Sequence, residues 1–237
     1  MAKGDLGILL LHALPLDGAM WKNQMHLFPD ATYAPNLYDF GDRLEDWAGE
    51  VLQLATERQL IVVGCSVGGS CALEIAQADP ERVAALVLIG TKASHNPDPD
   101  LHTSTITRLR TDGVDAAWRE IWAPHFWNAQ DEQAFATVRD IAKRQSIENL
   151  LKGLNAFHTR SCCEQLVTAS DIPIHVVTGE HDILPGRQQC AELAKLAPQG
   201  QMHVISSCGH YVPLEQPEQF NSVLNDVVTT QIQKTHR

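Results

Sequence analysis

The stretch IVVGCSVGGSCALEIA, residues 61–76, joins an apolar run of strand length to an apolar run of helix type. Four small residues, Gly64, Ser66, Gly68 and Gly69, lie at the junction. A G-x-S-x-G sequence between a strand and a helix is typical of a tight turn in which the serine takes a strained backbone conformation. Because the glycines leave room for this turn, we expect the Ser66 hydroxyl to lie at the carboxyl end of the strand.

Strand-like and helix-like segments alternate along most of the chain. Apolar runs rich in Val, Ile and Leu show little polar alternation, as expected of strands buried on both faces of a parallel sheet. They cover residues 6–12, 31–36, 59–64, 83–90, 172–179 and 200–206. Helical patterns cover residues 44–59, 67–80, 187–198 and 217–232. The alternation predicts an α/β fold, with a mostly parallel sheet of about six strands and helices on both faces.

Residues 92–170 interrupt this alternation, because they contain helical patterns without a convincing strand. The segment begins with a linker-like stretch rich in proline and polar residues. We therefore predict a helical cap at 92–170, inserted into a core formed by residues 1–91 and 171–237.

Composition narrows the classes of partner. A chain of 237 residues suits one domain with an insertion, and its net charge of −11 argues against nucleic acid or anionic membrane as partner. No run of about 18 apolar residues predicts a membrane span. The six cysteines lack metal-ligand spacing, so we expect free thiols, a reducing compartment and a cytoplasmic location. No motif for a metal or organic cofactor is present.

Two further residues follow predicted strands at the same sheet edge as Ser66. Asp182 comes after the strand at 172–179, and His210 after the strand at 200–206. A serine hydroxyl becomes a nucleophile only when a base removes its proton and an acid orients that base. The chain order Ser66, Asp182, His210 predicts such a catalytic triad. The alternatives are a capping serine, an aspartate at a helix N-cap or in a turn, and a hydrogen-bonded loop histidine.

Acyl transfer also requires donors for the developing oxyanion, normally two backbone N–H groups. We assign these to Val67, directly after the serine, and to Leu14, in the loop after the first strand. His12 is expected to brace that loop by hydrogen bonding. Cys65 is not expected to act as the nucleophile, because its side chain should point away from the site.

Four motifs carry a resemblance to a known family. They are LLLHALPLDGAMW (9–21), GCSVGG (64–69), TGEHDILPG (178–186) and CGHYVPLEQPEQF (208–220). Together they resemble the α/β-hydrolase superfamily, serine type, within its carboxylesterase, enol-lactonase and thioesterase-like group. The resemblance implies hydrolysis of a small-molecule ester, lactone or thioester through an acyl-enzyme, without a cofactor, by a monomer or homodimer.

The chain also departs from the family pattern. Ala13 replaces the usual glycine after the loop histidine, and the opening antiparallel hairpin is expected to be missing, so six strands are predicted rather than eight. Serine at position 66, where dehalogenases and epoxide hydrolases carry aspartate, disfavours those activities. A lyase of the hydroxynitrile-lyase type and a slow-turnover ligand receptor remain alternatives, with a scaffold protein less favoured.

Substrate binding is assigned to the cap, whose segment 109–127 is similar to that of 3-oxoadipate enol-lactonases. We predict that two of its aromatic residues reach the site and that the others belong to the core; the candidates are Trp118, Trp122, Phe126 and Trp127. Arg160 is a candidate for a substrate carboxylate, with a surface arginine as the alternative. Three histidines are interpreted as surface or packing residues: His125, His158 and His181.

Overall fold

The computed structural model describes residues 5–127 and 132–235 of the chain. Its centre is a six-stranded sheet in the order β2-β1-β3-β4-β5-β6, in which every neighbouring pair is parallel. The strands are β1 (Leu6–Leu11), β2 (Thr32–Tyr33), β3 (Gln59–Cys65), β4 (Val83–Ile89), β5 (Ile174–Gly179) and β6 (Gly200–Ile205). The predicted α/β fold with about six parallel strands is confirmed.

The middle of the sheet is apolar on both faces. Leu9 of β1 lies opposite Val62 of β3, which in turn lies opposite Leu86 of β4, and all three side chains are buried. The first predicted edge strand, 31–36, is shorter than expected and consists of Thr32–Tyr33 alone. Proline lacks an N–H group for the ladder, so Pro35 fits the early end of this strand.

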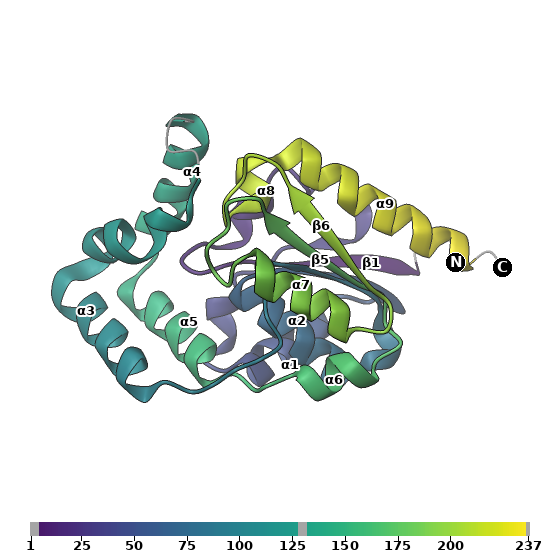
Figure 1. The fold of residues 1–237 in the computed structure, drawn as a ribbon, viewed down its shortest axis with the longest axis horizontal. Helices are drawn as coiled ribbons and strands as arrows, with labels where there is room; N and C mark the ends of the chain where they lie inside the picture. Colours follow the sequence, from purple (N-terminus) through teal and green to yellow (C-terminus); the bar gives the residue numbers. More distant parts are fainter. Residues whose placement is uncertain (1–4, 128–131, 236–237) are drawn as a thin grey trace.

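Helices cover both faces of the sheet. Figure 1 shows α9 on one side and α1, α2 and α7 on the other. These helices are α1 (Leu44–Leu54), α2 (Val67–Ala78), α7 (Arg187–Leu196) and α9 (Pro217–Thr235). Helix α1 ends five residues before the predicted limit of 59, because Ala55 is already extended and Gln59 begins β3.

The remaining helices divide between the connection from β4 to β5 and shorter turns elsewhere. The connection holds α3 (Pro99–Ala117), a π-helical turn η5 (Trp118–Trp122), η6 (Ala123–His125), α4 (Glu132–Lys143), α5 (Ile147–Thr159) and α6 (Glu164–Ala169). The shorter elements are η1 (Gly18–Trp21), η2 (Pro29–Ala31), η3 (Leu37–Phe40), η4 (Pro80–Arg82) and α8 (Val212–Glu215).

Helices α3, α4 and α5 lie together at the left of Figure 1, apart from α6, which lies beside the core helix α7. We retain residues 92–170 as the proposed cap and residues 1–91 and 171–237 as the proposed core. Among the described residues, no helix combines the length and apolar character needed to cross a membrane.

Candidate active site

Ser66 lies in a sharp turn between β3 and α2, with φ 55° and ψ −115°. A positive φ is uncommon outside glycine and costs on the order of 1–3 kcal/mol. The turn closes because its flanks lack side chains: a Cβ on Gly64 would lie 2.2 Å from Gly68 O, and one on Gly68 would lie 2.2 Å from Leu11 O. Within the buried run 60–76, Ser66 alone is partly exposed. The predicted strained turn is confirmed.

His210 and Asp182 meet in the loops that follow β6 and β5. His210 Nδ1 lies 3.1 Å from both carboxylate oxygens of Asp182, and the two side chains are 2% and 0% exposed. The Leu184 N–H also donates to Asp182 Oδ1 at 2.8 Å, which holds the carboxylate in place. Because Nδ1 faces the carboxylate, Nε2 is the nitrogen of His210 left to exchange a proton.

The end of β4 leaves room for this pair. Gly90 has a φ of 53°, and a Cβ there would lie 2.6 Å from His210 Cε1 and 3.0 Å from Asp182 Oδ2. A side chain at this position would therefore displace the imidazole or the carboxylate.

A cavity of about 200 Å³ contains both Ser66 and His210 in its wall. Most of the other lining residues are apolar. The full lining is Leu14, Ser66, Leu101, Thr105, Ile121, Trp122, His125, Leu154, Phe157, His158, Leu184, His210 and Tyr211. The structure thus brings together all three predicted triad residues, with Asp182 bonded to His210.

The loop after β1 supplies one side of this cavity. The N–H groups of Leu14 and Val67 have no hydrogen-bond partner among the described residues, and Val67 is the first residue of α2, where such groups are normally free. His12 braces the loop as predicted: its Nε2 accepts the Leu37 N–H at 2.9 Å, and its Nδ1 lies 3.2 Å from Ala13 O. Burial lowers the pKa of His12 to about 4, so the ring is neutral.

Asp17 ties the same loop to the segment between α4 and α5. Its carboxylate accepts hydrogen bonds from the Arg144 guanidinium at 2.9 to 3.2 Å and from Gln145 Nε2 at 2.7 Å, as well as from the Ala19 N–H at 2.9 Å. Burial alone would raise the pKa of Asp17, but the hydrogen bonds from Arg144, Ala19 and Gln145 outweigh it and hold the pKa below its usual value.

Glu215, which the sequence analysis did not single out, holds the loop around His210. Its Oε2 accepts the N–H groups of Trp127 and Gly209 at 2.9 and 3.0 Å, and its Oε1 accepts the N–H of Tyr211 at 2.9 Å. Burial raises the pKa of Glu215, while these three hydrogen bonds oppose the shift. A charged residue within the apolar run VPLE, five positions after His210, was the available sequence signal.

The segment at 122–127 is joined to the same loop by its backbone. The His210 N–H donates to His125 O at 2.9 Å, and the Tyr211 hydroxyl donates to Trp122 O at 3.3 Å. Together with the bond from Trp127 to Glu215, these contacts fix the segment relative to His210.

The aromatic candidates contribute less to the cavity than predicted. Of the four, Trp122 lines it, where two were expected. Trp118 and Phe126 are 2% and 6% exposed, and both pack on Phe135 with ring centroids 5.7 and 5.4 Å apart. They belong to the core, because both are buried and neither lines the cavity.

Trp127 and Arg160 also lie outside the lining. Trp127 is exposed and stacks on His181 with ring centroids 3.4 Å apart, so His181 has the packing role that we predicted. Arg160 is not a surface residue: it is 8% exposed, its guanidinium lies 4.1 Å from the Phe157 ring centroid, and it donates to Phe157 O. Burial lowers the pKa of Arg160 to about 10.

Two histidines interpreted as surface or packing residues line the cavity instead. They are His125 and His158, and burial lowers the pKa of each to about 4, so both rings are neutral at pH 7. His158 stacks on His102, with ring centroids 4.8 Å apart. His125 lies beside His210, with ring centroids 5.8 Å apart.

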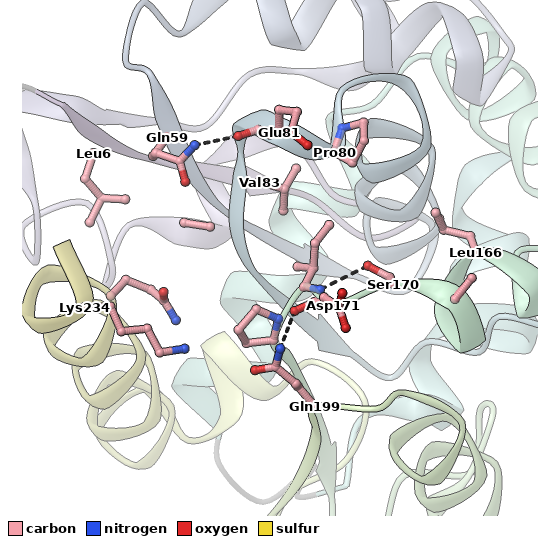
Figure 2. Close-up of a pocket in the computed structure, with 15 residues that line it drawn as sticks. Leu6, Gln59, Pro80, Glu81, Val83, Leu166, Ser170, Asp171, Gln199 and Lys234 are labelled. Atoms are coloured by element: carbon pink, nitrogen blue, oxygen red, sulfur yellow. Dashed lines mark hydrogen bonds between the residues drawn. The ribbon is translucent and has the colours of Figure 1, made fainter. Parts of the chain in front are cut away.

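A larger cavity, of about 640 Å³, lies at the opposite end of the sheet (Figure 2). Its wall includes the first residues of three strands, Leu6, Gln59 and Val83, whereas Ser66 follows the carboxyl end of β3. The side-chain amides of Gln59 and Gln199 donate to Glu81 O and Asp171 O, so they hold neighbouring loops rather than face a ligand. None of the predicted site residues lies there.

A parallel sheet that carries a serine at a strained strand–helix turn, facing a buried histidine–aspartate pair, is the arrangement of the α/β hydrolases. The sequence model of the Alpha/beta hydrolase family matches residues 8–223. The chain therefore belongs to this family.

Similar proteins include several hydrolases. The 2-hydroxy-6-oxo-2,4-heptadienoate hydrolase of Pseudomonas putida is 25% identical, over 94% of this chain and 89% of its own. Among solved structures, a thermophilic esterase from Thermogutta terrifontis superimposes with a TM-score of 0.86, at 24% identity, covering 95% of this chain and 90% of its own. The enol-lactonase of Burkholderia xenovorans has a TM-score of 0.81, at 20% identity, covering 97% and 94%. These two likenesses establish the shared fold.

Proposed function

We propose that this protein hydrolyses a carboxylic ester of a small molecule through an acyl-enzyme, with Ser66 as nucleophile, His210 as base and Asp182 as the acid that orients it. The observation that carries the proposal is the 3.1 Å contact between His210 Nδ1 and Asp182, because His210 lines the same cavity as Ser66. A buried acid–histidine pair beside a strained serine is costly to maintain, which favours a chemical role over a structural one.

The reaction follows from this arrangement. His210 Nε2 takes the proton of Ser66 Oγ as the oxygen attacks the acyl carbon, and the N–H groups of Leu14 and Val67 stabilise the oxyanion. The imidazolium then gives its proton to the leaving alcohol, and the ester C–O bond breaks. Water, deprotonated by His210, releases the acid from Ser66 by the same steps in reverse.

The cavity favours a short acyl group. Its volume of about 200 Å³ lies below the range of about 300–1,000 Å³ common for drug-sized ligands, and most of its lining is apolar. The esterase and lactonase names among similar proteins agree with a neutral ester or lactone as substrate. In a series of p-nitrophenyl esters, we expect kcat/KM to be highest for acetate or butyrate and to fall for octanoate and decanoate.

The central experiment compares Ser66→Ala with a matched serine control. Ser70 lies one turn further along α2 and is buried. With p-nitrophenyl butyrate, Ser66→Ala should lower kcat by roughly 10⁴-fold or more, whereas Ser70→Ala should retain it. A fluorophosphonate should label Ser66 and no other serine, as mapped by mass spectrometry. Equal kcat in the parent and Ser66→Ala would overturn the proposal.

The same preparation separates the rival functions. A lyase would release cyanide from mandelonitrile faster than it hydrolyses any ester of the series. A receptor would acylate once at Ser66 and then stall, so that p-nitrophenol release would stop after one equivalent. Sustained turnover of the esters supports the hydrolase.

A further inference from the structure

His125 is held beside His210 by backbone contacts and by the residues on either side of it. Its carbonyl oxygen accepts the His210 N–H at 2.9 Å, while Trp127 is bonded to Glu215. These bonds hold the backbone of His125 beside His210. Its side chain lies with its ring centroid 5.8 Å from that of His210, and it lines the same cavity as Ser66.

The imidazole of His125 has no hydrogen-bond partner among the residues that the structure describes, and its Nδ1 is fully buried. Buried polar atoms in proteins are almost always paired, so an unpaired one calls for an explanation. A buried N–H without a partner is rarer than a buried acceptor without one. The favoured tautomer therefore leaves Nδ1 unprotonated and carries the proton on Nε2.

The position of His125 defines which part of a substrate it meets. In the proposed mechanism the leaving alcohol oxygen receives its proton from His210, so the alcohol portion of an ester lies next to that ring. With ring centroids 5.8 Å apart and ring planes tilted by 56°, the two rings contact each other, so a group that lies against His210 in the cavity also lies beside His125. The lining nearest in sequence, Ile121 and Trp122, is largely apolar, so His125 is a hydrogen-bond donor in an otherwise apolar surrounding.

We propose that His125 determines specificity by donating a hydrogen bond from Nε2 to an acceptor oxygen on the alcohol portion of the ester. The inference rests on the proposed function, and it deepens that function by naming the substrate class: short-chain esters of small alcohols that carry an ether, keto or hydroxyl oxygen near the ester bond. The neutral state of the ring suits this role, because a neutral donor binds an uncharged oxygen without the cost of burying a charge.

The test uses two esters that differ in one atom. In 2-methoxyethyl butyrate an ether oxygen replaces one methylene of n-butyl butyrate, and this oxygen can only accept a hydrogen bond. Acid release is followed in a pH-stat at pH 7.5, and kcat/KM is measured for both esters. The parent should prefer the methoxyethyl ester by roughly 3- to 10-fold, as one neutral hydrogen bond allows.

Four variants identify the source of this preference. His125→Phe should reduce the ratio of the two kcat/KM values to about 1, while His125→Gln, whose amide nitrogen can reach the position of Nε2, should restore part of it. His158→Phe, which removes the other neutral imidazole of the cavity, should keep the ratio of the parent. Ser66→Ala should abolish hydrolysis of both esters.

Each outcome bears on one hypothesis. If Ser66→Ala loses hydrolysis of both esters but His125→Phe keeps the parent's ratio of kcat/KM values for the two esters, the role of His125 is overturned and the proposed function stands. Equal slowing of both esters in His125→Phe and His125→Gln also overturns it, because a structural role would not distinguish the alcohols. If thermal unfolding shows that His125→Phe does not fold, the kcat/KM ratio of the two esters is compared between the parent and His125→Gln instead. A parent that shows no preference for the methoxyethyl ester overturns the proposal.

Discussion

Replacing Glu215 by glutamine tests how the loop around His210 is held. The carboxylate accepts three backbone N–H groups, two at Oε2 and one at Oε1. Glutamine has one oxygen, so its best orientation keeps the bonds from Trp127 and Gly209 and turns an NH₂ group toward the Tyr211 N–H. One hydrogen bond to a charged group is then lost, at about 1.5–3 kcal/mol, and part of this is offset because a buried charge is also removed.

We therefore expect Glu215→Gln to lower the free energy of unfolding by about 2 kcal/mol and Glu215→Ala by about 5 kcal/mol, since alanine loses all three bonds. Total stabilities of about 5–15 kcal/mol make both changes measurable by urea denaturation. Because Gly209 and Tyr211 flank His210, the glutamine variant should also lose kcat toward p-nitrophenyl butyrate with little change in KM.

The control is Glu218→Gln, the same chemical change at an exposed position three residues further on. It should alter stability by less than about 0.5 kcal/mol. If Glu215→Gln matches Glu218→Gln in both unfolding free energy and kcat, the three contacts of Glu215 do not hold the loop, and the reasoning fails.

Four further predictions concern the surroundings of the cavity. Asp17→Asn should destabilise the protein at pH 7. Because the folded pKa of Asp17 is lowered, the difference in unfolding free energy between the parent and this variant should reach its full size above about pH 4 and shrink as the pH falls further. Urea denaturation at several pH values measures this difference. Gly68→Ala should cost more than about 3 kcal/mol or prevent folding, since its Cβ would meet the backbone of Leu11, and retention of the parent melting temperature would contradict the geometry of the turn. His12→Leu leaves the Leu37 N–H unpaired and should cost about 1–3 kcal/mol in a denaturant titration. Cys65 should resist thiol reagents in the folded protein, because burial raises its pKa well above the usual value, and Cys65→Ala should keep ester turnover.

The sheet and the convergence of Ser66, Asp182 and His210 could be predicted because both depend on local patterns. Buried parallel strands have a recognisable composition. Ser66 directly follows β3, Asp182 lies three residues after β5, and His210 lies five residues after β6. Parallel strands end at a common edge, so position along the chain was enough to bring distant side chains together.

The proposed cap at 92–170 was less predictable, because its helices are irregular. Gly113 interrupts α3 with φ 78° and ψ 178°, and a π-helical turn follows at Trp118–Trp122. These breaks change the period of side-chain directions, so spacing along the sequence did not identify Trp122 as the one aromatic candidate in the lining. The roles of His125 and Glu215 arise from contacts between segments almost ninety residues apart, which no local pattern reports.

The hydrogen bonds that join residues 122–127 to the loop around His210 limit how this protein can be re-engineered. A cap grafted from another hydrolase would replace three backbone groups that bond to this loop or to Glu215: Trp122 O, His125 O and the Trp127 N–H. If the grafted backbone did not place its own groups at the same positions, the imidazole of His210 would shift. Chimeras should therefore be cut inside the cap, after residue 127 and before Arg144, so that the native anchors on both sides remain with the recipient. Among the described residues, the exchanged segment contains none that line the cavity, so the cavity wall is altered by separate substitutions, for example at Leu101 or Leu154.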